Sequence, residues 1–294
     1  MIGNSINTKM YYYLVAMRVP HYIKNTIIFV PSFFNLGVAI NYNDLIISFI
    51  SLCFAASAGY LINDANDIKT DKNSYLKKKR VLVTKKVSLI SAKLLSFFLI
   101  IISLFLSYLV GIKIFYLVLI YIGSTFLYTY VIKKIIFLDI IFLSFFYVLR
   151  MIMGVIISGQ SITIWLLILS FIFFLNFSAI KRLVDINNYI KKDKSNIYNI
   201  SSSKKLVTLI YFFSLILPII AFTYLFWDAY IFESIGIGVL LTIIISIWIT
   251  FISKLAFNKK IQKDFITFIF KDIISQITFL ICAILLTLNI YLSY

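Results

Sequence analysis

One stretch organises the chain: Gly59-Tyr60-Leu61-Ile62-Asn63-Asp64-Ala65-Asn66-Asp67-Ile68-Lys69-Thr70-Asp71-Lys72. More than two helical turns of apolar residues precede it, and it runs on into Lys77-Lys78-Lys79-Arg80. A buried helix therefore emerges here into a basic loop. Of only 11 acidic residues in the chain, three fall within this stretch, so the chemistry of the protein is expected here.

Four oxygen-bearing side chains of this stretch are predicted to share one helix face. At about 100° per residue, Asn63, Asp67 and Asp71 lie about 40° apart, and Asp64 falls just beyond Asp71. Mg²⁺ takes oxygen ligands and is bound by one or two carboxylates together with substrate phosphates. A solvated acidic turn neutralised by lysines is the alternative, but like charges on one face repel without a counter-ion. The pattern favours a divalent metal site.

The composition is that of a membrane protein. Hydrophobic residues make up 62% and charged residues 13% of the 294 residues, whereas soluble domains have about 45–50% and 25%. The apolar blocks have helical length and lack the alternation of a β-barrel, so the fold class is all-α, a polytopic membrane helix bundle. Cys53 and Cys282 lie in apolar runs and indicate neither a disulfide framework nor a metal site.

About nine membrane spans are predicted. They cover residues 22–40, 44–63, 88–110, 113–132, 136–157, 161–180, 204–226, 229–253 and 272–292. We therefore expect residues 1–294 to form a single integral membrane domain, with the loops 64–87 and 181–203 capping the active site.

Charge sets the predicted orientation. The net charge is +17, and nearly all of the 28 basic residues lie in alternate connections between spans. This distribution argues against nucleic acid as a partner and for anionic lipid and phosphorylated substrates. The positive-inside rule places the N-terminus and the basic loops in the cytoplasm, and nine crossings place the C-terminus outside the cytoplasmic membrane.

Other polar residues stand out in or beside the apolar runs. Arg18 and Lys24 can be read as side chains that reach the interface, but this does not explain Asn25 just inside the first span. Arg150 lies within the fifth span, where a charge facing lipid costs several kcal/mol. It should face a polar cavity or form an ion pair with a carboxylate such as Asp139, and both interpretations remain open.

These residues resemble the UbiA superfamily of intramembrane prenyltransferases. Asn63-Asp64-x-x-Asp67-x-x-x-Asp71 is similar to its first aspartate motif. Within the superfamily the chain most resembles the decaprenyl-phosphate phosphoribosyltransferase branch. That likeness rests on Arg18-x-Pro20-His21-Tyr22-x-Lys24-Asn25, on Tyr128-Thr129-x-x-Ile132-Lys133 with Asp139, on Leu149-Arg150, and on Lys181-Arg182-x-x-Asp185. Tyr22 replaces the branch's tryptophan, Asp185 replaces a glutamate, and the usual proline after Arg80 is missing.

The resemblance implies transfer of phosphoribose from phosphoribosyl diphosphate to polyprenyl phosphate, with Mg²⁺ as cofactor and release of diphosphate. It implies Asn63, Asp64, Asp67 and Asp71 as metal ligands. The catalytic candidates are Asp64, Asp67, Lys24, Arg150 and Asp185. The candidates for substrate binding are Asn25, Lys79, Arg80, Tyr128, Lys133, Asp139, Lys181 and Arg182. The oligomeric state stays open.

Two other functions fit parts of the pattern. A prenyltransferase with an aromatic or other lipophilic acceptor would use the same first motif but prefer a second pair of aspartates, and Asp185 has no acidic neighbour until Asp193. A transporter would place its charges at the midplane with broken helices. Here the carboxylates gather at one predicted membrane surface, and the chain has only three prolines.

The predicted topology can be tested with reporter fusions. A reporter fused after Tyr294 should be external, and one inserted near Lys192 should be cytoplasmic, because three of the predicted spans separate these two positions. Reporter activity in intact cells measures both positions. The same side for both would show that the number of spans is wrong.

Overall fold

The computed structural model describes residues 2–34, 40–73, 77–159, 164–190, 205, 207–209, 211–212, 235–258, 260–261, 268–269 and 271–292. These residues are helical with short turns, and no strand occurs among them. The predicted span 204–226 lies mostly outside the described residues. The predicted loop 181–203 is described only as far as residue 190, and residues 181–190 are helical rather than a loop.

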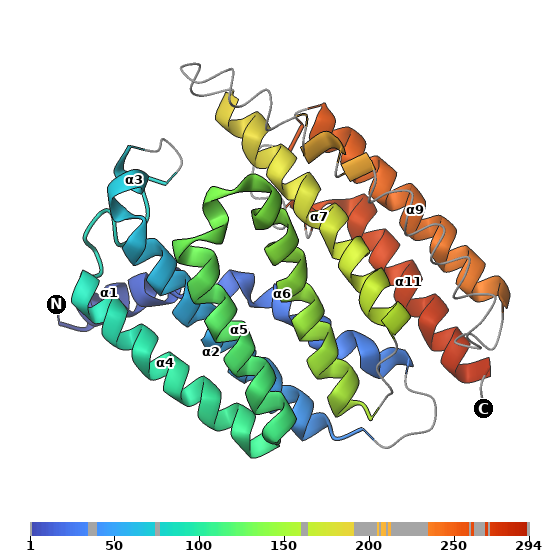
Figure 1. The fold of residues 1–294 in the computed structure, drawn as a ribbon, viewed down its shortest axis with the longest axis horizontal. Helices are drawn as coiled ribbons and strands as arrows, with labels where there is room; N and C mark the ends of the chain where they lie inside the picture. Colours follow the sequence, from blue (N-terminus) through green and yellow to red (C-terminus); the bar gives the residue numbers. More distant parts are fainter. Residues whose placement is uncertain are drawn as a thin grey trace. The chain divides into compact units, whose positions relative to one another are not determined.

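The helices follow one another along the chain (Figure 1). They are α1 (Ile2–Ala16), η1 (Val19–Phe34), α2 (Tyr42–Asn66), α3 (Ile68–Lys72), α4 (Leu89–Val110), α5 (Ile112–Tyr130), η2 (Ile132–Lys134), α6 (Ile136–Ile157), α7 (Ile164–Ile190), α9 (Ile235–Phe257) and α11 (Ile273–Leu292).

Four of the described helices are long and apolar enough to cross a membrane. They are α2, α4, α5 and residues Phe137–Ile157 of α6, and shorter apolar stretches occupy Ile243–Phe257 and Ile273–Leu285. The all-α membrane fold predicted from the composition is thereby confirmed. The number of nine spans stays a prediction.

The N-terminal part differs from the expected polar arm followed by an α-helical span. Residues 2–16 form α1, and a turn at Met17 and Arg18 leads into η1, which is a 3₁₀ helix of 16 residues. Pro20 stands in the first turn of η1, where its missing N–H leaves no bond unmade. A 3₁₀ helix rises about 2.0 Å per residue, so η1 is about 32 Å long, close to the thickness of a hydrocarbon core.

The chain divides into two compact units. The first contains Met1–Phe29, Ala39–Ile135 and Leu149–Gly159, and the second contains Val30–Val38, Ile136–Val148 and Gln160–Tyr294. In the second unit, the buried core includes Ile140 of α6, Leu183 of α7 and Ile252 of α9. Trp248 of α9 donates a hydrogen bond to Ser275 of α11 over 3.0 Å. That bond satisfies the indole N–H within an apolar core.

The first unit is built on close contact between α2 and α4. Ser51 of α2 donates to the carbonyl oxygen of Ser103 over 2.8 Å, and Ser103 of α4 donates to that of Ser51 over 2.8 Å. Further along, Ser96 donates to the carbonyl oxygen of Ala58 over 3.2 Å. Small residues let membrane helices approach closely, and their hydroxyl groups then bond across the interface. These contacts fix α2, which carries the aspartate motif, against α4.

Helix α5 approaches α2 closely at Gly59. A Cβ atom added to Gly59 would lie 3.4 Å from Cβ and Oγ1 of Thr125, at the tight limit of packing. A single added Cβ atom would just touch Thr125, so a side chain larger than that of alanine would collide with it. By contrast, a Cβ atom added to Gly123 of α5 would meet nothing within 4 Å.

This difference predicts the stability of two matched variants. Gly59→Val should destabilise the protein by about 1–3 kcal/mol, because its methyl groups would collide with Thr125 and force α2 and α5 apart. Gly123→Val, which adds the same atoms to a helix where nothing lies close, should cost less. Thermal unfolding in detergent measures both. Equal destabilisation would show that the contact between α2 and α5 does not limit the size of residue 59.

Candidate functional site

The aspartate motif lies where α2 ends. Asp67 has φ −92° and ψ 2° and separates α2 from the short helix α3. The backbone bonds continue through this residue, because the Asp67 N–H donates to the Asn63 carbonyl over 3.0 Å and the Asp71 N–H donates to the Asp67 carbonyl over 2.8 Å. Asn63, Asp67 and Asp71 therefore keep roughly their predicted helical spacing, although the helix is not continuous.

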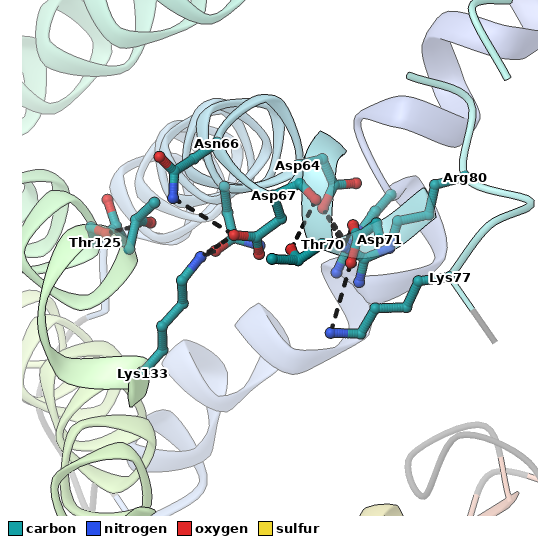
Figure 2. A network of polar contacts seen from close by, with 12 residues as sticks. Asp64, Asn66, Asp67, Thr70, Asp71, Lys77, Arg80, Thr125 and Lys133 are labelled. Carbon is teal, nitrogen blue, oxygen red and sulfur yellow. Dashed lines mark hydrogen bonds and ion pairs between the residues drawn. The ribbon is translucent and has the colours of Figure 1, made fainter. Parts of the chain in front are cut away.

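Two of the three carboxylates of the motif converge on Arg80. Arg80 Nη1 lies 2.9 Å from Asp64 Oδ1 and 2.7 Å from Asp71 Oδ2 (Figure 2). Lys77 Nζ lies 3.8 Å from the other oxygen of Asp71. Asp64 and Asp71 are buried, whereas Lys77 is exposed. The loop after α3 thus folds back and brings a guanidinium between two buried carboxylates.

The third carboxylate has a different cation. Lys133 of η2 donates to Asp67 Oδ1 over 2.5 Å and to Asn63 Oδ1 over 2.9 Å. Asn66 also donates to Asp67 Oδ1, over 3.4 Å. Figure 2 shows Lys133 reaching Asp67 from the side of α5, and Lys77 and Arg80 reaching Asp71 from the loop. The motif therefore forms two neighbouring pairs, Asp64 with Asp71 and Asn63 with Asp67.

Arg18 is a residue of the site that sequence reasoning missed. It was interpreted as an interfacial side chain, but its Nη2 lies 2.5 Å from Asp64 Oδ1, and its guanidinium lies over the Tyr60 ring at 4.8 Å. Burial would lower the pKa of Arg18, but the adjacent Asp64 carboxylate outweighs this and raises it. The nearby Pro20 marked this turn in the sequence, yet no spacing rule predicts a contact across 46 positions.

The carboxylates have cationic partners within the protein, so the prediction that only a metal ion neutralises them is wrong. In the structure, four cationic side chains face the three carboxylates: Arg18, Lys77, Arg80 and Lys133. The metal assignment must therefore rest on the geometry of the carboxylates.

Asp64 and Asp71 are the candidate ligands for a divalent cation. A single nitrogen of Arg80 lies near an oxygen of each, so these two carboxylates face the same point. Among the described residues, no group of three or more His, Cys, Asp or Glu side chains lies close enough to hold a metal. A metal site here would have two carboxylates, with water or substrate oxygens as its other ligands.

A second polar cluster surrounds Arg150. Its Nε donates to Asn25 Oδ1 over 2.7 Å, and its Nη2 donates to the Tyr121 hydroxyl over 2.8 Å. Asn25 donates in turn to Cys53 Sγ over 3.3 Å. Arg150, Asn25, Tyr121 and Cys53 are all buried. The polar surroundings expected for Arg150 are present, and Tyr121 is a member of this cluster that the sequence did not reveal.

The remaining candidates are distributed over both units. Asp139 Oδ2 lies 3.3 Å from Arg182 Nε, so the structure gives Asp139 an ion-pair partner other than the Arg150 considered from the sequence. Lys181 is partly buried and Asp185 is exposed on α7. In the first unit, Lys24 and Tyr128 are partly buried and Lys79 is exposed. Whether Lys181, Arg182 and Asp185 join the aspartate motif in one active site stays a prediction.

Comparison with known proteins shows a family match over most of the chain. A model of the UbiA prenyltransferase family matches residues 26–274. The curated relative "Uncharacterized protein y4nM" of Sinorhizobium fredii is 25% identical over 177 residues. The aligned region is 59% of this chain and only 34% of that protein, so this chain spans about a third of that relative's length.

Solved structures share the fold over nearly the whole chain. A UbiA homologue from Archaeoglobus fulgidus bound to DMAPP and Mg²⁺ has a TM-score of 0.72 at 17% identity and covers 96% of this chain and 98% of its own. The same protein bound to GPP and Mg²⁺ has a TM-score of 0.70 at 17% identity, with coverage of 96% and 99%. A digeranylgeranylglyceryl phosphate synthase has a TM-score of 0.67 at 20% identity, with coverage of 97% and 99%.

The two bonds of Arg80 predict how the loop after α3 behaves. In Arg80→Ala, amide hydrogen exchange over residues 77–88 should become faster, because the side chain that ties this loop to Asp64 and Asp71 is lost. Lys69→Ala, which removes an exposed cation of α3, is the control and should leave this exchange unchanged. If both variants exchange like the wild-type protein, the loop is held by other contacts.

Proposed function

Since the chain belongs to the UbiA prenyltransferase family, we propose that it transfers phosphoribose from phosphoribosyl diphosphate to polyprenyl phosphate with release of diphosphate. The protein is an integral membrane protein. The reaction is assigned to the cytoplasmic face of the cytoplasmic membrane, where the soluble donor can meet the head group of the lipid. Mg²⁺ is the proposed cofactor.

The observation that carries the proposal is the alternation of carboxylates and cations at the end of α2. Asp64 and Asp71 share Arg80, and Asp67 faces Lys133. A site that only bound a metal would need the carboxylates alone, and a site that only bound phosphate would need the cations alone. Both kinds of group together suit a substrate that arrives as a metal complex of a diphosphate.

The chemistry requires little proton transfer. A phosphate oxygen of the lipid forms a bond to the anomeric carbon of ribose, and the bond from that carbon to the diphosphate oxygen breaks. Diphosphate leaves with the electron pair, and the lipid phosphate monoester becomes a diester. Because the attacking phosphate is already anionic at neutral pH, no general base is needed. His21, the one histidine in the chain, need have no catalytic role.

The residues of the chain supply binding and charge. Mg²⁺ held by Asp64 and Asp71 would neutralise the diphosphate as it leaves. Asp67 and Asn63 hold Lys133 in position, and Lys133 and Arg80 would donate hydrogen bonds to phosphate oxygens. Asn25 orients Arg150, and we assign these two residues with Lys24 to the phosphates of the substrates. Lys79, Tyr128, Asp139, Lys181, Arg182 and Asp185 remain assigned to the same substrates by their resemblance to the branch.

A prenyltransferase acting on a lipophilic acceptor is the second candidate. The solved UbiA homologue with DMAPP or GPP and Mg²⁺ supports it, because its fold covers nearly the whole chain. In that case the prenyl diphosphate would be the donor, and the same carboxylates and cations would hold its diphosphate. The proposed donor is favoured by the Lys24-Asn25 and Lys181-Arg182-x-x-Asp185 patterns.

A direct assay separates the two candidates. Purified protein with Mg²⁺, polyprenyl phosphate and labelled phosphoribosyl diphosphate should yield labelled lipid and an equal amount of diphosphate. Asp64→Asn and Asp67→Asn should each lower turnover at least about a hundredfold, since the first loses a metal ligand and the second the anchor of Lys133. Circular dichroism and gel filtration in detergent check that both variants remain folded.

The controls decide between the donors. A prenyl diphosphate with an aromatic acceptor replaces the two substrates in a parallel reaction. Product only in that reaction would reject the phosphoribosyl proposal and support the second candidate. Full activity of both aspartate variants at saturating Mg²⁺ would reject the assigned site.

A further inference from the structure

Two arginines bind the same oxygen atom. Arg18 Nη2 lies 2.5 Å and Arg80 Nη1 lies 2.9 Å from Asp64 Oδ1. Arg80 also bonds Asp71, so its position is explained by two carboxylates. Arg18 comes from the turn between α1 and η1, far from the motif in sequence. Its guanidinium therefore adds a further positive charge to a carboxylate that is already paired.

The backbone of Arg18 is held in an unfavourable conformation. Its φ is 55°, in the left-handed region that residues with a Cβ seldom adopt. The turn is closed by bonds from the Arg18 N–H to Val15 O over 3.1 Å and from the His21 N–H to Arg18 O over 2.8 Å. Such strain persists only where surrounding contacts stabilise it, and it gathers at functional sites. Here it directs the guanidinium over Tyr60 and onto Asp64.

A metal ion would compete with these arginines. A divalent cation bound to Asp64 would draw electron density from the same carboxylate that now accepts two charge-assisted hydrogen bonds. It would thereby weaken the hydrogen bond between Arg18 and Asp64 and leave a guanidinium beside the metal. A planar guanidinium with several N–H donors suits two oxygens of a phosphate group.

We propose that Arg18 binds the diphosphate of the donor, and that Asp64 holds Arg18 in place until metal and diphosphate arrive together. This inference rests on the proposed function only in that the donor carries a diphosphate, whichever group is transferred. Before binding, Arg18 is a counter-ion that competes with the metal. After binding, it is a ligand of the diphosphate. The site therefore binds the donor without metal, and the metal without donor, more weakly than it binds the metal complex of the donor.

Removal of the Arg18 side chain should change the affinity for metal alone and the affinity for the metal complex of diphosphate in opposite directions. Without Arg18, the metal ion alone should bind more tightly, roughly three- to tenfold, because a competing cation is gone. The metal complex of diphosphate should bind more weakly, roughly ten- to a hundredfold, because charge-assisted hydrogen bonds are lost. A residue that merely supported the fold would weaken both.

The test uses Arg18→Gly and a matched control, Lys85→Gly. Glycine adopts positive φ without steric cost, so Arg18→Gly removes the side chain while keeping the turn. Lys85 is also basic, has φ 57° and is exposed, and none of the ion pairs among the described residues involves it. Lys85→Gly therefore makes the same kind of change without removing an ion-pair partner of the motif. Titration calorimetry of the full-length protein in detergent measures binding of Mn²⁺ alone and of inorganic diphosphate at saturating Mn²⁺. Lys85→Gly should match the wild-type protein in both titrations.

Arg18→Lys completes the series. This variant keeps the positive charge without the planar guanidinium. It should therefore bind the metal alone about as weakly as the wild type does, and regain only part of the diphosphate affinity that Arg18→Gly loses. The inference is overturned if Arg18→Gly binds metal and diphosphate as the wild type does, if it weakens both, or if the wild type binds no diphosphate with metal. Inorganic diphosphate belongs to both donor candidates, so failure of the phosphoribosyl assay leaves this result intact and the two failures remain distinguishable.

Discussion

The ion pairs on Asp64 hold together three segments that are remote in sequence. Arg18 supplies the turn before η1, Asp64 the end of α2, and Arg80 the loop before α4. A buried carboxylate without its partners would be strongly destabilising. Arg80 also bonds Asp71 and so ties the short helix α3 to the same junction. The motif is thus a structural junction as well as a candidate site of chemistry.

Sequence patterns predicted the helices well where hydrophobicity alone determines them. The predicted spans 88–110, 113–132 and 136–157 lie within two residues of α4, α5 and α6. The N-terminal part was harder, because a 3₁₀ helix with Pro20 and Pro31 has no hydrophobic signature distinct from an α-helix. The resemblance to UbiA proteins was confirmed by the family match.

The site could be predicted only as far as local spacing reaches. The position of Asp64, Asp67 and Asp71 near one another follows from helical geometry, but their cations do not. Lys133 meets Asp67 across 66 positions of sequence, and Arg18 meets Asp64 across 46. Such pairings depend on which helices pack together, and the periodicity of a single sequence does not determine this. For the same reason the partner of Asp139 proved to be Arg182 on another helix.

The reciprocal serine bonds between α2 and α4 have a consequence for how the protein meets its bilayer. Because Ser51 and Ser103 each bond the other's carbonyl, sliding one helix by a single residue would break both bonds. Asp64 lies about 20 Å along α2 from this point, at 1.5 Å per residue. The distance between the carboxylates and this contact is therefore set by the protein and not by the bilayer. In a thicker or thinner membrane, α2 and α4 must tilt together, and the position of the motif relative to α4 stays constant.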